Sequence, residues 1–164
     1  LANNVRSGDS ENLEARAAAF YWKNIFPEIP DFKRTRDGAA PNNILNYGYA
    51  ILRAIIARAL VGSGLLPTIG IHHHNRYNAF CLADDIMEPY RPYVDKLVYD
   101  YCNTNENWCP NLDKEAKVAL LGLPVEDVII DGHRSPLMIA ATTTTASLFK
   151  CFSGVSRKIL YPEF

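Results

Sequence analysis

Apolar residues recur at the spacing of an α-helix along most of the chain. The segments with this spacing are residues 7–26, 41–64, 78–102, 112–123 and 136–152. Segment 41–64 carries too many apolar positions for one narrow stripe, so we expect it to be the buried central helix. Pro89 and Pro92 should break or kink segment 78–102, and Ser10 is a suitable cap for the first helix. The pattern predicts a mainly α fold.

The segment before the last helix has the signals of short strands. Asp131-Gly132 is a typical hairpin turn, so residues 125–138 predict a small hairpin; in the alternative, Ser135 and Pro136 begin the last helix. The four threonines at 142–145 favour a strand locally, but the apolar spacing around them favours a helix. We therefore expect one helical domain, residues 1–164, with a small hairpin or short strands.

The amino-acid composition restricts the classes of protein to which the chain can belong. The chain has 164 residues, 48% hydrophobic and 21% charged, as expected of one globular domain with a real core. No run approaches about 18 consecutive apolar residues, which argues against a membrane span. No signal-peptide core is present, so we expect a cytoplasmic protein with reduced thiols; a disulfide or metal site at Cys102 and Cys109 is the alternative. The net charge of -1 leaves only local basic patches for nucleic acid, such as Lys33, Arg34 and Arg36.

Residues 70–92, GIHHHNRYNAFCLADDIMEPYRP, hold most of the candidate chemistry. Three of the four histidines, His72–His74, precede the acidic helical segment 83–88. His73 lies in a turn from which it can fold back over the acidic face. Imidazole together with carboxylates suits Mn²⁺ or Mg²⁺ and phosphoryl chemistry. The competing interpretation is a solvated acidic helix face with exposed histidines.

Glu14 is a further candidate. It begins the apolar face of the first predicted helix, alongside Ala18 and Tyr21. A glutamate at that position usually complements the helix dipole. Glu11 is better placed for that role, which leaves Glu14 available as a metal ligand.

Three stretches together resemble the Cas1 family of CRISPR-associated integrases: residues 11–22, 70–92 and 150–164. The family shows an E-x-x-A-x-x-x-Y-[FW] helix, a G-x-x-H turn and a D-x-x-E motif fifteen residues on. The corresponding residues here are Glu14, Ala17, Tyr21 and Trp22, then Gly70 and His73, then Asp85 and Glu88. The sequences of these stretches are most similar to the family members that accompany type II systems. The resemblance covers nearly the whole chain.

The resemblance implies that this chain is the helical C-terminal catalytic domain of a longer protein, without its β-rich N-terminal domain. It implies Glu14, His73 and Glu88 as catalytic metal ligands for Mn²⁺ or Mg²⁺, with Asp85 as an auxiliary residue. Because three histidines are adjacent, the motif alone does not decide which of them is the metal ligand. The spacing to Gly70 and Glu88 favours His73.

The implied activity is that of a metal-dependent DNA endonuclease and integrase, which inserts captured prespacer DNA into a CRISPR array by 3′-hydroxyl attack at a repeat boundary. Implied partners are double-stranded and branched DNA, a second copy in a homodimer, Cas2 and the type II effector nuclease. Candidates for phosphate contacts are Lys33, Arg34, Arg36, Arg76 and Arg91, for each of which a solvated surface charge is the alternative.

Two other classes compete with this interpretation. A non-catalytic helical scaffold that binds DNA or a protein partner would use Glu14 as a helix cap and segment 83–88 as a solvated surface. A phosphohydrolase of the His-Asp type needs a histidine followed directly by aspartate, and none of the four histidines is. We therefore rank the phosphohydrolase last.

Overall fold

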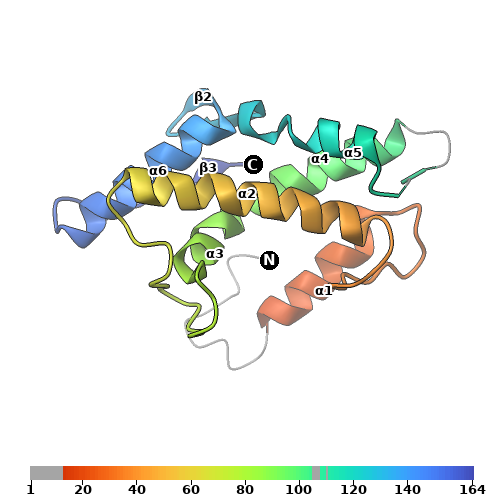
Figure 1. The fold of residues 1–164 in the computed structure, drawn as a ribbon, viewed down its shortest axis with the longest axis horizontal. Helices are drawn as coiled ribbons and strands as arrows, with labels where there is room; N and C mark the ends of the chain where they lie inside the picture. The colour runs from red at the N-terminus through yellow and green to blue at the C-terminus, as the bar shows by residue number, and fades with distance from the viewer. Residues whose placement is uncertain (1–12, 105–107, 110) are drawn as a thin grey trace.

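The computed structural model describes residues 13–104, 108–109 and 111–164, except for the side chain of Glu14; the expected cap Ser10 lies outside them. It confirms the mainly α fold with a small sheet (Figure 1). The elements in chain order are α1 (Leu13–Ile25), α2 (Asn42–Gly62), α3 (Cys81–Met87), the 3₁₀ turn η2 (Glu88–Tyr90), α4 (Arg91–Asn103), α5 (Lys114–Leu120), the 3₁₀ turn η3 (Leu123–Val125), β1 (Asp127–Ile130), β2 (His133–Pro136), α6 (Leu137–Phe152) and β3 (Pro162–Glu163).

Helix α2 is the central helix, as its apolar pattern predicts. It packs against α3, α4, α5 and α6, and Leu52 and Ile56 at its middle are fully buried. A side chain at Gly48 would come within 2.5 Å of Val94 Cγ1, so the glycine lets α2 and α4 approach closely. By length and its mean hydropathy of 1.4, α2 would also suit a membrane span. Its buried side chains instead form the core with the neighbouring helices.

The predicted break in segment 78–102 occurs at Pro89. Helix α3 ends at Met87, η2 follows, and α4 begins at Arg91 with Pro92 in its first turn. Proline fits there because the first turn of a helix does not need its N–H groups. Glu88 consequently lies at the corner between two helices.

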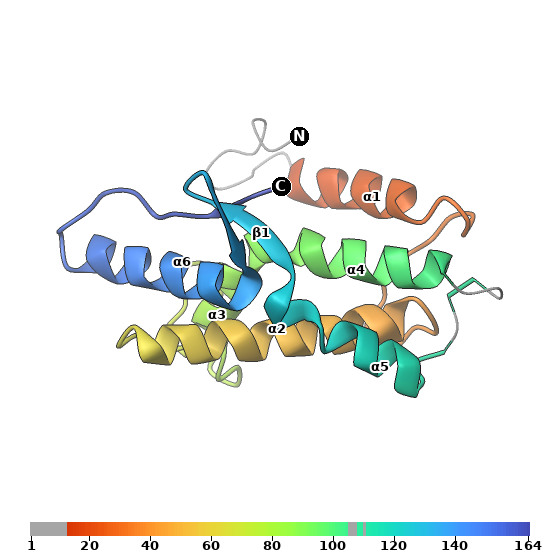
Figure 2. The same cartoon turned by 90° about the horizontal axis from the view of Figure 1, so that it is seen from above.

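The hairpin is confirmed, with a third strand that the sequence did not predict. Strand β1 pairs antiparallel with β2 through a turn at Asp131-Gly132, where both residues have positive φ, and it pairs antiparallel with β3 on its other edge. The chain after α6 runs back along the molecule to reach β1 (Figure 2). At two residues, β3 is too short for a period-2 pattern. The return of the chain places Tyr161 near α3.

Two expectations from the sequence are wrong. The face of α1 around Ala18 and Tyr21 is not a buried apolar face: Ala18 is exposed and Tyr21 is only partly covered, because α1 lies at the edge of the molecule beside α4 (Figure 2). Cys102 and Cys109 form a disulfide, because the loop after α4 returns Cys109 to the last turn of that helix. Cys81 and Cys151 are free thiols, the first buried and the second half-buried.

Candidate functional site

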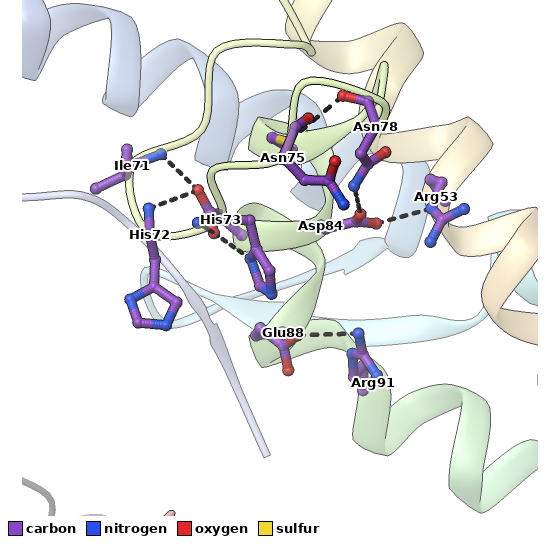
Figure 3. A network of polar contacts seen from close by, with 11 residues as sticks. Arg53, Ile71, His72, His73, Asn75, Asn78, Asp84, Glu88 and Arg91 are labelled. Carbon is purple, nitrogen blue, oxygen red and sulfur yellow. Dashed lines mark hydrogen bonds and ion pairs between the residues drawn. The ribbon is translucent and has the colours of Figure 1, made fainter. Parts of the chain in front are cut away.

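The Asp85 carboxylate fastens the histidine loop to α3. The backbone N–H groups of Ile71 and His72 donate to its Oδ2 over 2.6 and 3.0 Å (Figure 3). The backbone N–H of His73 donates to Oδ1 over 3.1 Å, and the His73 ring approaches the same oxygen through Nδ1 at 2.6 Å. The prediction that His73 folds back over the acidic helix is therefore confirmed.

These contacts orient the ring of His73. A carboxylate only accepts hydrogen bonds, so the ring donates from Nδ1. In the neutral ring, this tautomer leaves the lone pair for a metal ion on Nε2. Partial burial acts to raise the pKa of Asp85, but hydrogen bonds from the His72 N–H, the His73 ring and the N–H groups of His73 and Ile71 outweigh it and lower that pKa. Asp85 thus stays ionised and orients the imidazole, as carboxylates do behind metal-binding histidines.

Gly70 makes this loop geometry possible. A Cβ at position 70 would overlap the carbonyl oxygen of His73, and would lie 2.9 Å from Cys81 Cβ and 3.1 Å from Asp85 Oδ2. The His73 oxygen belongs to the backbone and Cys81 is buried in α3, so neither has much room to move. The G-x-x-H spacing therefore has a steric basis in the tight turn.

His73 and Glu88 line the same hollow. It has a volume of about 360 Å³ and is lined by Ile71, His72, His73, Asp85, Ile86, Glu88 and Tyr161. His74 is exposed and is not among its lining residues. Tyr161 was missed from the sequence, because only the return of the chain to β1 brings it here; burial and the nearby Cys151 and Asp85 raise its pKa.

The donors at this hollow suit a divalent ion in kind. An imidazole nitrogen and a carboxylate are ordinary ligands of Mn²⁺ and acceptable ones for Mg²⁺. Among the described side chains, however, no group of three histidine, cysteine, aspartate or glutamate residues lies close enough to hold an ion. The third predicted ligand, Glu14, has its backbone in α1, and its side chain lies outside the described part of the chain.

Asp84 belongs to a different set of contacts from Asp85. Its Oδ1 lies 2.7 Å from Arg53 Nε on α2, and its Oδ2 accepts a hydrogen bond of 2.7 Å from Asn78 (Figure 3). The adjacent carboxylates therefore have different partners: Asp85 binds the histidine loop, and Asp84 forms an ion pair with Arg53. An acidic run read from the sequence does not separate these roles.

A second concave surface, which we call the basic groove, lies beside the hollow. It has a volume of about 850 Å³, and its lining includes the four arginines Arg34, Arg36, Arg53 and Arg91. Arg91 also pairs with Glu88 of the hollow. Three of these arginines were predicted; Arg53 was missed, because its position depends on how α2 crosses α3.

The five predicted basic residues do not form one set. Lys33 lines another hollow, beside Trp22, and Arg76 donates to the hydroxyl of Tyr77 and stacks on its ring. Arg34 lines the groove but donates to the side chains of Asn42 and Asn46 over 3.0 and 2.5 Å. Of the predicted residues that line the groove, Arg36 is exposed, whereas Arg91 is half-buried and paired with Glu88.

Comparison with known proteins identifies the family. Residues 7–120 match the family described as "CRISPR associated protein Cas1". The chain belongs to the Cas1 family. It is 50% identical to the CRISPR-associated endonuclease Cas1 of Neisseria meningitidis over 99 residues, which are 60% of this chain and 31% of that protein. It is 32% identical over 155 residues to a Cas1 endonuclease of Pyrobaculum aerophilum, covering 89% of this chain and 52% of that protein.

The fold also occurs in a casposase. A solved structure of a casposase bound to integration product superposes with a TM-score of 0.72, over 91% of this chain and 48% of that chain, at 22% identity. At this identity the likeness shows the fold alone. The chain spans about half or less of the length of these Cas1 relatives and of the casposase.

Proposed function

We propose that the protein containing this chain is a metal-dependent DNA endonuclease and integrase. In this proposal His73, Glu88 and Glu14 hold Mn²⁺ or Mg²⁺, and Asp85 orients His73. The observation that carries it is the placement of His73 and Glu88 in one hollow that an ion pair connects to a groove with four arginines. Membership of the Cas1 family supports the same activity.

The reaction is a phosphodiester exchange. The 3′ oxygen of the captured strand attacks a phosphorus at the repeat boundary, a new P–O bond forms, and the old P–O bond breaks to release a 3′-hydroxyl on the cut strand. The proton of the attacking hydroxyl is lost and one is gained by the leaving oxygen, so the step needs no oxidant or energy source. A bound divalent ion would supply charge stabilisation at the phosphate.

The side chains of this chain supply orientation and binding. Asp85 holds His73 through Nδ1, and Nε2 of the neutral ring would be the atom that binds the ion. The arginines of the basic groove would neutralise phosphates on the incoming DNA without reading its sequence. A homodimer, Cas2 and the type II effector nuclease are the partners that we propose from the family resemblance, and the cytoplasm is the proposed location.

Strand joining by the full-length protein tests this proposal. The assay contains Cas2, labelled prespacer DNA and a repeat-containing plasmid, with Mn²⁺, with Mg²⁺ or with chelator. We expect metal-dependent joining that Glu88→Ala abolishes. Glu115→Ala, which removes an exposed glutamate on α5, is the matched control and should join normally. Bound DNA without joining under any metal would instead identify a non-catalytic binding module.

A further inference from the structure

Asp95 is a buried carboxylate where three helices meet. It lies on α4 and is 2% exposed. The Tyr21 hydroxyl of α1 donates to its Oδ2 over 2.6 Å, and the Tyr49 hydroxyl of α2 donates to its Oδ1. Burial raises the pKa of Asp95, although both phenols and the charges of Arg91 and Arg34 oppose this shift. No metal-site or DNA-binding role above uses this carboxylate.

Tyr21 attaches a helix that has little other burial. None of the described side chains of α1 is fully buried, and Trp22 and Ile25 pack against the core only near the end of the helix. The Tyr21–Asp95 hydrogen bond therefore fixes the rotation and height of α1 against α4. A hydrogen bond to a buried carboxyl oxygen costs free energy to break, so it favours one such position.

The position of α1 matters because this helix carries Glu14, the third proposed metal ligand. Residues 14 and 21 are seven positions apart, which is about two helical turns, so they lie on the same face of α1 about 10 Å apart. Any rotation of the helix about its axis at Tyr21 thus moves position 14 as well.

The second phenol connects Asp95 to the other side of the site. The Tyr49 ring carries the guanidinium of Arg91 at 5.0 Å from its centroid, and Arg91 pairs with Glu88 over 2.9 Å. The Tyr49–Asp95 bond holds that ring in place. The same carboxylate therefore also holds the ring on which Arg91 lies. Tyr21→Phe leaves that contact intact and so tests the α1 contact by itself.

We propose that Asp95 is a positioning residue, which acts through Tyr21 to set Glu14 relative to His73 and Glu88. The inference rests on the proposed metal-dependent function. It assigns no contact between Asp95 and metal or DNA. Its consequence is that removal of the Tyr21 hydroxyl alone should weaken metal binding without weakening DNA binding.

Tyr21→Phe in the full-length protein provides the test, since it removes one oxygen and keeps the ring. Amide hydrogen exchange should become faster in α1 and stay unchanged in α2 and α4. The Mn²⁺ concentration for half-maximal joining should rise by about 10- to 100-fold, as for other groups that orient metal ligands. Excess Mn²⁺ should restore the rate, and the affinity for DNA should not change.

Tyr99→Phe is the matched control, because the Tyr99 hydroxyl makes a long 3.5 Å contact with Glu28 at the surface. It should leave hydrogen exchange and Mn²⁺ dependence as in the wild type. Asp95→Asn should also weaken Mn²⁺ binding, although it disturbs the Tyr49 contact as well. Adding Tyr21→Phe to it should weaken Mn²⁺ binding no further, because the Tyr21 contact is already lost.

The outcomes separate this inference from the proposed function. A wild-type protein with metal-dependent joining, together with unchanged Mn²⁺ dependence in Tyr21→Phe, would overturn the positioning role and leave the integrase proposal standing. Faster exchange in α1 without a change in Mn²⁺ dependence would likewise reduce Asp95 to a structural residue. Absence of metal-dependent joining in the wild type would overturn both.

Discussion

Arg91 Nη2 lies 2.9 Å from Glu88 Oε1, and this ion pair connects the hollow of His73 to the basic groove. The guanidinium is placed where it would meet either a metal ion at Glu88 or a phosphate in the groove. A dication at Glu88 and the positive charge of Arg91 repel each other. Arg91 should therefore have opposite effects on metal binding and on DNA binding.

Arg91→Gln should strengthen Mn²⁺ binding by up to about fivefold, because an ion pair this exposed contributes about 1 kcal/mol or less. The same change should weaken DNA binding and lower the slope of its salt dependence by about one. Calorimetric titration with Mn²⁺ and fluorescence anisotropy with labelled DNA measure the two effects. Arg58→Gln, on the exposed side of α2, is the control. Weaker Mn²⁺ binding in Arg91→Gln would show that the arginine supports the ligand rather than competing with the ion.

The three adjacent histidines should differ sharply in their importance. His73→Ala should abolish strand joining, since Asp85 orients the His73 ring at the hollow that His73 shares with Glu88. His74→Ala should reduce joining by less than about threefold, because a solvated surface residue contributes little and His74 does not line the hollow. His72→Ala should have an intermediate effect, as its side chain lines the hollow without contacting Asp85. Initial rates of joining compare the three variants, and loss in His74→Ala with retention in His73→Ala would move the ligand by one position.

Gly70→Ala should disrupt the histidine loop. The added methyl group would overlap the His73 carbonyl oxygen, so the turn must open and His73 must leave Asp85. We expect joining to fall by at least about 100-fold, since a shift of about 1 Å in a reacting group has this effect. Gly62→Ala is the matched control: it lies at the end of α2 with open space around it, so it should be neutral or slightly stabilising. Equal activity of the two variants would contradict the tight-turn geometry.

The fold was largely predictable because its signals are local. The apolar period, Pro89 and Asp131-Gly132 place the helices, the break and the hairpin within a few residues of their observed bounds. The loop fold-back of His73 onto the acidic helix also followed from their closeness in the chain. These features depend on residues near each other in sequence.

Long-range contacts were not predictable from these local signals. Arg53 joins the groove only because α2 crosses α3, and Tyr161 joins the hollow only because β3 pairs with β1. The sequence pattern places Tyr21 on an apolar face, but its hydroxyl donates a hydrogen bond to Asp95, 74 positions away. Spacing along one helix does not reveal a partner on another.

Arg36 should contribute more to DNA binding than Lys33. Arg36 lines the basic groove, whereas Lys33 lines a separate hollow beside Trp22. Arg36→Gln should lower the salt slope of DNA affinity by about one, as expected for the loss of one phosphate contact. Lys33→Gln should leave the slope unchanged. Affinities at several salt concentrations compare them, and a larger effect of Lys33→Gln would place the DNA outside the groove.

Asp85→Asn should cost stability as well as activity. The carboxylate accepts from three backbone N–H groups and the His73 ring, whereas an amide presents an NH₂ to half of these donors. Loss of hydrogen bonds to a charged group should lower the free energy of unfolding by about 1.5–3 kcal/mol at neutral pH. Asp100→Asn, at a half-exposed pair with Lys96, should lower it by less than about 1 kcal/mol.

The stability difference between wild type and Asp85→Asn should depend on pH. The pKa of Asp85 is lower in the folded protein than its usual 3.8, so the unfolded chain binds its proton more readily than the folded one. The stabilisation is therefore fully present above 3.8 and is lost as the pH falls through the lower, folded pKa. Urea unfolding across this range should show the two proteins converging in strong acid. A difference that stays constant down to the lowest pH would show that the Asp85 contacts do not depend on its charge.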